Sequence, residues 1–495
     1  MREILSFLYN PSLSESSALC LDDTYYSYSQ LRDRVFSIAR HIDAHQLRNS
    51  MIGIYVSDHI DTYASILAVW ITGNAYVPLH PSYPSSRIES IRKMADLKLV
   101  LSTVEDVPGI SDEPVTTNTT CLSIEGLPPT YPLIERSQND LAYILFTSGS
   151  TGVPKGVRIN WGNLQSFLRH VDSMHLGLPE HGRYLQMFEF TFDLSVVSIL
   201  LPLIHGGTIY HVSSTRVKYL EIYRLLEEYE IHFAIIVPSV LAMLRPYFDS
   251  ISLPSLRVMA LSGEAVPLGL TQAWQVCCPN AQFYNFYGPT ECTIFCTVYK
   301  IPRAEIKSHN GIVCIGSPTI DSKAQLRDES GILTSSNLKG DLWIGGAQTS
   351  PGYVHIEELN ARLFLEFEGI RYYNTGDIVI QDDDGDLFYL GRKDHQIKLN
   401  GYRVELSEVE YQAEQHLKLK TAAIVSTDQK GVRHLILYVE GTEIDSETIR
   451  AQLQKALPKY MLPETILLMQ AFPLNQNGKL DRNQLRSLYE SNSPQ

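Results

Sequence analysis

A loop rich in hydroxyl groups and glycine occupies residues 146–156 and follows the apolar run 141–145. Glycine lets a backbone turn and approach a ligand closely, consecutive N–H groups can point at an anion, and Ser, Thr and Lys add donors and a positive charge. A Walker A loop requires G-x-x-x-x-G-K-[ST], whereas three residues separate Gly152 from Gly156 here and no Ser or Thr follows Lys155. The loop therefore predicts phosphate binding outside the P-loop NTPases. A flexible linker has a similar composition, but a linker need not follow a buried strand.

Two carboxylates stand in unusual surroundings. Asp193, in the segment 190–195, has apolar neighbours, which is costly unless the carboxylate meets a cation. An Asp before an apolar run is also a common helix start, so this second interpretation stays open. Glu291 ends the segment 281–291, which supplies a strand, a Gly-Pro turn, a hydroxyl and a carboxylate in succession. Mg²⁺ favours carboxylate oxygen together with phosphates, so Glu291 beside the phosphate loop predicts a single protein ligand for that ion.

Composition limits the kinds of function. The formal net charge of −14 argues against general nucleic-acid binding, because a phosphate-reading surface needs a basic excess. The seven cysteines include no C-x-x-C pair and are interpreted as reduced thiols. The N-terminus does not resemble a secretory signal, and the longest apolar run, near 196–204, is too short to span a membrane. We therefore expect a soluble cytoplasmic protein with no membrane span.

Helical and strand periodicities alternate along the first part of the chain. Apolar spacing predicts helices over 28–45, 60–72, 84–95 and 161–171, and buried strands over 52–56, 75–79, 97–101 and 141–145. This alternation implies parallel β-α units. Residues 105–139, which are rich in Pro, Ser, Thr and acidic groups, are expected to form a loop leading to the phosphate loop.

The pattern changes after residue 393. Residues 397–405 alternate like one strand, Ser407 to Glu410 has capping-box spacing ahead of a helix, and strands over 421–425 and 434–439 precede a helix ending near Leu457. We expect an α/β protein with a large N-terminal region of parallel α/β subdomains and a small β-rich part, residues 1–393, plus a small C-terminal α+β domain, residues 394–495.

Taken together, these ordered motifs make the chain resemble the adenylate-forming enzymes. Within them it is similar to the amino-acid adenylation domains of nonribosomal peptide synthesis and to free-standing D-alanine ligases. The resemblance covers nearly the whole chain. It implies ATP-dependent formation of an aminoacyl-AMP, followed by transfer to a phosphopantetheine thiol. ATP and Mg²⁺ are the implied cofactors, and a carrier protein is the implied partner.

The resemblance also implies roles for individual residues. Lys479, on a turn before the last helix, matches the mobile catalytic Lys, although an exposed turn often carries a Lys. Asp394 marks the hinge, and Lys398 belongs to the face used in thiol transfer. The implied catalytic residues are Lys479, Thr290 and Glu291, with Glu291 as the metal ligand. The implied ATP-binding residues are Thr147, Ser148, Gly149, Ser150, Thr151, Gly152, Lys155, Asn285, Tyr287, Asp377, Tyr389 and Arg392.

The same resemblance places Asp193 on the amino group of an amino-acid substrate. The substrate side chain would face Leu194, Val197, Ile236, Ala260, Ser262, Phe286, Ile294 and Phe295. None of these eight residues is ionisable, and burying an unpaired charge among them would cost several kcal/mol. We therefore expect a small or medium, mostly apolar amino acid, such as alanine, valine or proline.

Two other functions remain alternatives at this point. In an acyl- or aryl-CoA ligase of the same superfamily, the Asp193 carboxylate would be an unfavourable buried charge. A catalytically silent nucleotide-binding protein would be expected to lack Lys479, Glu291 or the Thr147 loop, and all of them are present. Because the sequence shows no carrier-protein Ser motif, we expect the carrier to be a separate chain.

Overall fold

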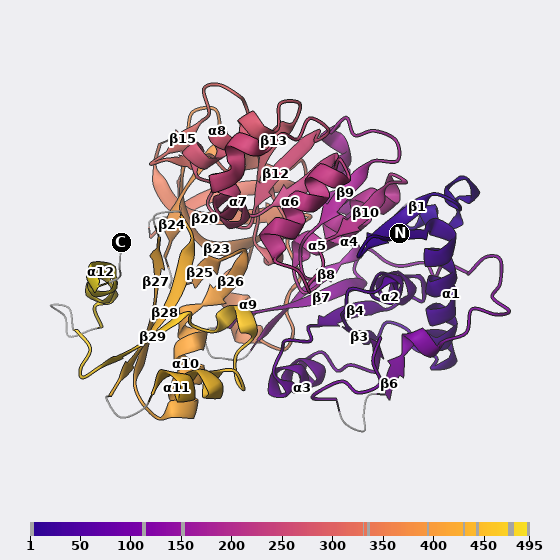
Figure 1. The fold of residues 1–495 in the computed structure, drawn as a ribbon, viewed down its shortest axis with the longest axis horizontal. Helices are drawn as coiled ribbons and strands as arrows, with labels where there is room; N and C mark the ends of the chain where they lie inside the picture. The colour runs from indigo at the N-terminus through magenta and orange to yellow at the C-terminus, as the bar shows by residue number, and fades with distance from the viewer. Residues whose placement is uncertain are drawn as a thin grey trace.

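The computed structural model, drawn in Figure 1, describes residues 4–110, 115–149, 154–329, 331–333, 337–393, 396–428, 431–441, 445–473 and 480–492. The expected α/β fold is confirmed. Within these ranges, none of the helices combines the length and the apolar character that a bilayer-spanning segment requires. All seven cysteines are free thiols.

A seven-stranded sheet forms the indigo and violet part of Figure 1 and carries the phosphate loop at the end of its strand β7. In spatial order its strands are β21 (Gly352–Tyr353), β8 (Lys155–Asn160), β7 (Leu141–Thr147), β4 (Ala75–Leu79), β3 (Met51–Tyr55), β5 (Leu99–Ser102) and β6 (Val115–Asn118). Strand β3 is parallel to both β4 and β5, so the predicted parallel β-α units are confirmed. The helices of this part are α1 (Tyr28–Ala44), α2 (Ile60–Ile71), α3 (Ser85–Met94) and α4 (Trp161–Ser173).

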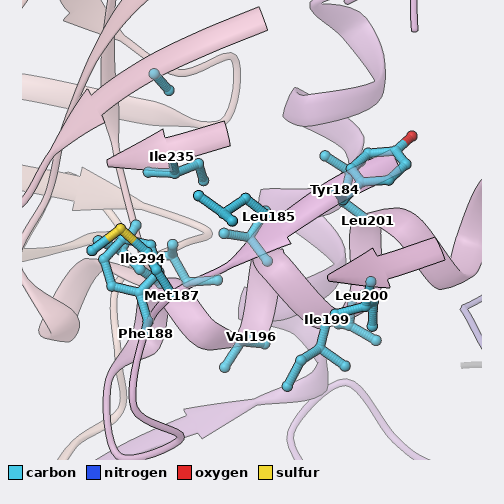
Figure 2. Close-up of a cluster of buried hydrophobic side chains, with 14 of the residues drawn as sticks. Tyr184, Leu185, Met187, Phe188, Val196, Ile199, Leu200, Leu201, Ile235 and Ile294 are labelled. Carbon is cyan, nitrogen blue, oxygen red and sulfur yellow. The ribbon is translucent and has the colours of Figure 1, made fainter. Parts of the chain in front are cut away.

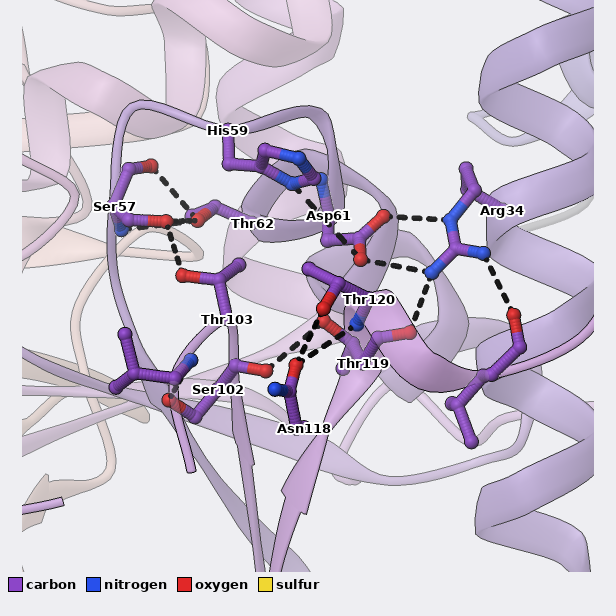
Figure 3. A network of polar contacts seen from close by, with 12 residues as sticks. Arg34, Ser57, His59, Asp61, Thr62, Ser102, Thr103, Asn118, Thr119 and Thr120 are labelled. Carbon is purple, nitrogen blue, oxygen red and sulfur yellow. Dashed lines mark hydrogen bonds and ion pairs between the residues drawn. The ribbon is translucent and has the colours of Figure 1, made fainter. Parts of the chain in front are cut away.

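Helices α1 and α2 are joined by a buried ion pair, which Figure 3 shows. The Arg34 guanidinium donates to both oxygens of Asp61, at 2.7 and 2.8 Å, and to the carbonyl oxygen of Thr119 at 2.5 Å. Asp61 has no exposed side-chain surface, so its charge depends on this pairing. The pair ties the two helices to the segment that follows β6.

A nine-stranded sheet, most of it magenta in Figure 1 with the indigo strand β1 near one edge, presents the Asp193 region. In spatial order its strands are β17 (Ser317–Pro318), β14 (Thr297–Ile301), β13 (Gln282–Tyr287), β12 (Val258–Ser262), β11 (Phe233–Ile236), β9 (Arg183–Gln186), β10 (Thr208–His211), β1 (Ser17–Leu21) and β2 (Thr24–Ser27). Its helices are α5 (Asp193–Ile204), α6 (Lys218–Glu228), α7 (Pro238–Leu244) and α8 (Leu268–Cys277). Helix α5 packs against β9 and β10, and Figure 2 shows several of its apolar side chains in this cluster, so Asp193 begins a helix that is otherwise buried.

A third sheet corresponds to the predicted β-rich part. It contains β19 (Gly331–Leu333), β18 (Ser322–Asp328), β20 (Lys339–Gly346), β23 (Ile370–Gln381) and β22 (Phe364–Phe367), with β24 (Leu387–Arg392) also paired to β23. Helix α9 (Glu357–Leu363) precedes β22. This sheet brings Asp377 opposite Arg392 in the β23–β24 register.

The C-terminal part has apolar cores of its own, one formed by buried residues between Leu399 and Met461. Its elements are the hairpin β25 (Gln396–Leu399) and β26 (Tyr402–Glu405), the sheet β27 (Thr421–Thr427), β28 (Arg433–Glu440) and β29 (Thr465–Met469), and the helices α10 (Leu406–Leu417), α11 (Ser446–Leu453) and α12 (Arg482–Asn492). Residues 394 and 395 lie outside the described ranges, so the domain division at 393/394 stays a prediction.

Two expectations for the C-terminal part were wrong. Residues 397–405 form a hairpin rather than one strand, because Asn400 and Gly401 adopt φ values of 51° and 85°, which an Asn-Gly turn tolerates. Ser407 does not cap a helix, since α10 starts at Leu406 and its N-cap residue Glu405 makes no side-chain cap bond.

Three boundaries or short elements also differ from the sequence expectations. The predicted loop 105–139 contains the short strand β6, which pairs in parallel with β5. The helix expected to end near Leu457 ends at Leu453, and the strand β29 after it was not predicted. Short strands such as these are defined by their pairing partner, which local periodicity does not reveal.

Candidate active site

A small cavity of about 90 Å³ lies where the phosphate loop, helix α5 and the C-terminal hairpin meet. Many of the residues singled out in the sequence line it. Those residues are Thr147, Ser148, Asp193, Leu194, Ser262, Thr290, Ile294, Asp377, Arg392 and Lys398. The fold therefore gathers side chains from three sheets and from the C-terminal hairpin at one place.

Asp193 is the first residue of α5, and its carboxylate lies in the cavity wall. Burial raises the pKa of Asp193 to about 6, although hydrogen bonds from the Thr290 hydroxyl and the Leu194 backbone lower it. Within the described residues no Lys, Arg or His forms an ion pair with this carboxylate, and Lys398 acts on it only at longer range. The helix-start interpretation and the charged-ligand interpretation are both compatible with this position, because the helix N-terminus also favours a negative charge.

Glu291 is fully buried and is held by two neighbours. The Arg403 guanidinium donates to its two oxygens at 2.7 and 3.1 Å, and the Tyr353 hydroxyl donates at 2.6 Å. Burial by itself would raise the pKa of Glu291, but the Arg403 charge and the hydrogen bonds from Tyr353 and Arg403 together leave this pKa lowered. In this arrangement the carboxylate predicted to hold a metal is therefore paired with an arginine from β26.

The described part of the phosphate loop is also occupied by groups from the C-terminal part. The Gly149 N–H donates to Glu408 Oε2 at 2.9 Å, and the Ser148 hydroxyl donates to the Arg403 carbonyl at 2.9 Å. Glu408 Oε1 accepts from Arg87 at 2.8 Å in a buried ion pair. Lys155 Nζ lies 3.7 Å from Glu405 Oε1. Carboxylates thus lie against donors of a loop that has the composition of an anion cradle.

A second cavity, of about 420 Å³, lies beside strand β13 and is lined by Asn285, Phe286, Tyr287, Tyr389, Arg392 and Lys398, among others. The Tyr287 hydroxyl donates to Asp377, and Arg392 Nη1 donates to the same carboxylate at 2.7 Å. The Asn285 amide donates to the Cys314 carbonyl at 2.9 Å, which fixes its orientation. Tyr287 and Arg392 line this cavity, and the Asp377 carboxylate that both contact lines the adjoining small cavity. A planar ring, a guanidinium and a bidentate acceptor at this boundary match the needs of a nucleoside.

Lys398 reaches the boundary of the two cavities from the hairpin. Its Nζ lies 5.5 Å from the centre of the Tyr287 ring, which is within cation–π range. Burial lowers the pKa of Lys398, and the Asp377 charge partly offsets that effect. The hairpin therefore brings a cation between the nucleoside-type cavity and Asp193.

The eight residues predicted for the substrate side chain are only partly gathered. Leu194, Ser262 and Ile294 line the small cavity, and Phe286 lines the larger one. Phe295 is stacked on Phe286, with ring centroids 4.1 Å apart, and lies behind it in the core. The remaining three, Val197, Ile236 and Ala260, are buried and line neither cavity.

Several predicted residues lie outside the described ranges, namely Ser150, Thr151, Gly152, Asp394 and Lys479, so their roles stay predictions. Sequence reasoning missed other residues at the site: Arg87, Tyr353, Arg403, Glu405 and Glu408. The Asn400-Gly401 pair was the available signal for Arg403 and Glu405, because a hairpin there sends β26 back into the site.

A comparison with protein families matches residues 12–354 of the chain to the family described as AMP-binding enzyme. The chain belongs to this family. Family members form adenylates from ATP, so the chain is an ATP-using, AMP-forming ligase. The matched span includes the phosphate loop, Asp193 and Glu291 but ends before Asp377 and the C-terminal hairpin.

Individual relatives match nearly the whole length of this AMP-binding enzyme. It is 30% identical over 470 residues to the D-alanine–D-alanyl carrier protein ligase of Lactiplantibacillus plantarum, covering 92% of each chain. It is 30% identical over 487 residues to the phosphinothricin tripeptide synthetase PhsC of Streptomyces viridochromogenes, covering 95% of this chain but 44% of that protein. The fold is similar to that of the Vibrio cholerae adenylation domain AlmE, solved with glycyl-adenosine-5'-phosphate, with a TM-score of 0.87, 23% identity and coverage of 99% and 97%.

Proposed function

We propose that this AMP-binding enzyme activates a small or medium, mostly apolar amino acid as its aminoacyl-AMP and transfers it to the phosphopantetheine thiol of a separate carrier protein. One observation carries the amino-acid part: Asp193 is a carboxylate in the cavity wall, at the start of a buried apolar helix, without an ion-pair partner among the described residues. The ammonium group of an amino acid would supply the missing cation. The similarity to a carrier protein ligase supports the transfer part.

Adenylate formation requires the substrate carboxylate to attack the α-phosphate in line, which is chiefly a matter of positioning and charge neutralisation. We assign Asp193 to the amino group and Thr290 to the α-phosphate. Asp377 accepts from the ribose hydroxyls, and Tyr287 and Asn285 contact the base. The phosphate loop donors and Lys155 hold the pyrophosphate end, and Lys479 holds the substrate carboxylate.

The residues present fit one Mg²⁺ ion. This ion commonly takes one or two carboxylates and completes its shell with phosphate oxygens and water. Glu291 offers one buried carboxylate, and the described residues contain no group of three or more His, Cys, Asp or Glu that could hold a metal by itself. When bound, the ion neutralises charge on the triphosphate. Arg403 must leave Glu291 before the carboxylate can serve this role.

The observed arrangement suits the step after pyrophosphate has left. Glu408 and Glu405 lie against the phosphate-loop donors, and a pyrophosphate anion in the same place would be repelled by them. Lys398 meanwhile lies at the boundary of the two cavities. We therefore assign this arrangement of hairpin and phosphate loop to the transfer step.

The test is amino-acid-dependent exchange of pyrophosphate into ATP, measured for the common amino acids and their D-forms. We expect exchange with one or more of alanine, valine and proline, and essentially none with glutamate, lysine or arginine. Strong exchange with a charged amino acid, or with a fatty or aryl acid that lacks an amino group, contradicts the role given to Asp193.

A further inference from the structure

The tip of the β25–β26 hairpin fits closely against the large N-terminal part. The Gly401 N–H donates to Glu264 Oε1 at 2.8 Å, and Glu264 Oε2 accepts from the Ser239 N–H at 2.9 Å, at the start of α7. A Cβ atom on Gly401 would lie 2.9 Å from a methyl carbon of Val237. One carboxylate therefore ties the hairpin tip to a helix of the nine-stranded sheet.

A second carboxylate holds the next residue of the tip. The Tyr402 hydroxyl donates to Glu189 Oε1 at 2.5 Å. The Tyr402 ring is stacked on Tyr460, with centroids 4.4 Å apart, and meets Phe192 edge-on at 4.8 Å. Since Phe192 directly precedes Asp193, the position of the Tyr402 ring is coupled to the start of α5.

The imidazole of His80 lies beside the other oxygen of Glu189. The Ser82 N–H donates to His80 Nδ1 at 3.1 Å, so the neutral imidazole carries its proton on Nε2. Nε2 lies 3.5 Å from Glu189 Oε2, an oxygen that has no hydrogen-bond partner among the described residues. The imidazole thus faces this oxygen and leaves Oε1 to Tyr402.

The tip that these groups hold is a shared wall between cavities. A wide cavity of about 1000 Å³ is lined by His80, Glu189, Lys218, Tyr402, Lys459 and Tyr460, among others. Tyr460 also lines the small cavity that contains Asp193. A narrow cavity shares Phe192 and Gly401 with the small cavity, and it shares Glu189 and Tyr402 with the wide one. A displaced tip would change the shape of the wall that these cavities share.

We propose that Glu189 and Glu264 are positioning residues for the transfer step, because they hold the hairpin tip through Tyr402 and Gly401. This role rests on the proposed function. In the transfer step the thiol sulfur forms a bond to the carbonyl carbon of the aminoacyl adenylate and the C–O bond to AMP breaks. AMP leaves with the electron pair, and the thiol proton passes to the buffer.

The first experiment compares the two half-reactions, with free pantetheine as the thiol probe. The Tyr402→Phe variant removes one hydroxyl and keeps the ring. We expect its transfer rate from preformed adenylate to fall about tenfold, with ATP–pyrophosphate exchange unchanged. We expect the same result for Glu189→Ala. Glu189→Gln keeps an acceptor and should restore most of the transfer rate. The exposed Tyr411→Phe serves as the control.

Normal transfer in both Tyr402→Phe and Glu189→Ala overturns the proposal, and so does an equal loss of exchange and transfer, which indicates a general structural role. Hydrogen–deuterium exchange of the chain alone tests the tip without relying on either reaction. Peptides covering 396–405 should exchange faster in Glu264→Gln and Tyr402→Phe than in Tyr411→Phe. Unaltered exchange in these peptides contradicts the proposed contacts, whereas absence of any amino-acid-dependent activity in the wild type contradicts only the proposed function.

Discussion

The wall behind Asp193 is held by apolar packing, whereas the surface that receives the β25–β26 hairpin is held by charged groups. Around α5, buried side chains such as Leu185, Leu200 and Ile235 fill the space between helix and sheet (Figure 2). At the hairpin, the contacts are ion pairs such as Arg403 with Glu291 and Arg87 with Glu408. A close-packed apolar wall has few alternative arrangements, whereas a carboxylate on an anion-binding loop can be exchanged for a phosphate. The amino-acid end of the site therefore has a fixed shape, whereas the carboxylate that occupies the phosphate end can be replaced.

The largest expected effect comes from removing the negative charge of Asp193. Asp193→Asn should lower amino-acid-dependent exchange at least about 100-fold, since removing one partner of a buried ion pair costs about 3–5 kcal/mol. Exchange kinetics at saturating ATP measure the loss. Asp172→Asn, an exposed position on α4, is the matched control, and near-normal exchange in Asp193→Asn would falsify the assigned ion pair.

The same variant has a pH signature. Because the folded-state pKa of Asp193 is raised to about 6 from its ordinary value of 3.8, protonation favours the folded state, and stability is lost as the pH rises through this range. Asp193→Asn should therefore unfold at a higher temperature than the wild type at pH 7, with the difference vanishing below about pH 4. Capture of the amino acid by the wild type should weaken as the pH falls below about 6. A melting temperature at pH 7 that is unchanged by the substitution contradicts the buried charge.

The next effect tests the apolar wall itself. Leu200→Ala removes a fully buried side chain from α5 and should cost about 2–5 kcal/mol of stability through lost burial and a cavity. The midpoint of denaturant unfolding measures this cost. Leu220→Ala, at a largely exposed position on α6, is the control. Equal midpoints for the two variants would show that this wall tolerates voids.

An intermediate effect concerns the nucleoside end. Asp377→Ala should raise KM for ATP about 10- to 100-fold, because hydrogen bonds to a charged acceptor contribute about 1.5–3 kcal/mol, while KM for the amino acid changes much less. Asp377→Asn keeps one acceptor, so its KM for ATP should lie between those of Asp377→Ala and the wild type. Unchanged KM for ATP would remove the ribose assignment.

The smallest effect tests the replaceable occupant. Glu408→Gln keeps the shape of the side chain at the Gly149 N–H but removes the charge that pairs with Arg87. Transfer to pantetheine should slow about fivefold, in line with roughly 1 kcal/mol for a weakened contact, with no loss of ATP–pyrophosphate exchange. If ATP–pyrophosphate exchange falls as much as transfer does, Glu408 serves both steps. The idea that this carboxylate gives way to a phosphate is then contradicted.

The sequence by itself determined the family resemblance, the α/β class and many of the residues that meet at the site. Local periodicity was sufficient for long elements such as α1 and α2, because their apolar spacing reports which face is buried. The Asp193 and Glu291 segments stood out for a similar reason, since a carboxylate in apolar surroundings requires an unusual partner.

Only the tertiary structure decided what those carboxylates contact. Glu291 pairs with Arg403, which is 112 positions away in the chain, and Gly149 donates to Glu408, 259 positions away. No local pattern encodes such pairs, because ion pairing depends on distance in space rather than in sequence. The same limit applies to the substrate pocket. Three residues predicted to line it are buried in the core instead: Val197, Ile236 and Ala260. A helix or strand directs only some of its side chains toward a given cavity.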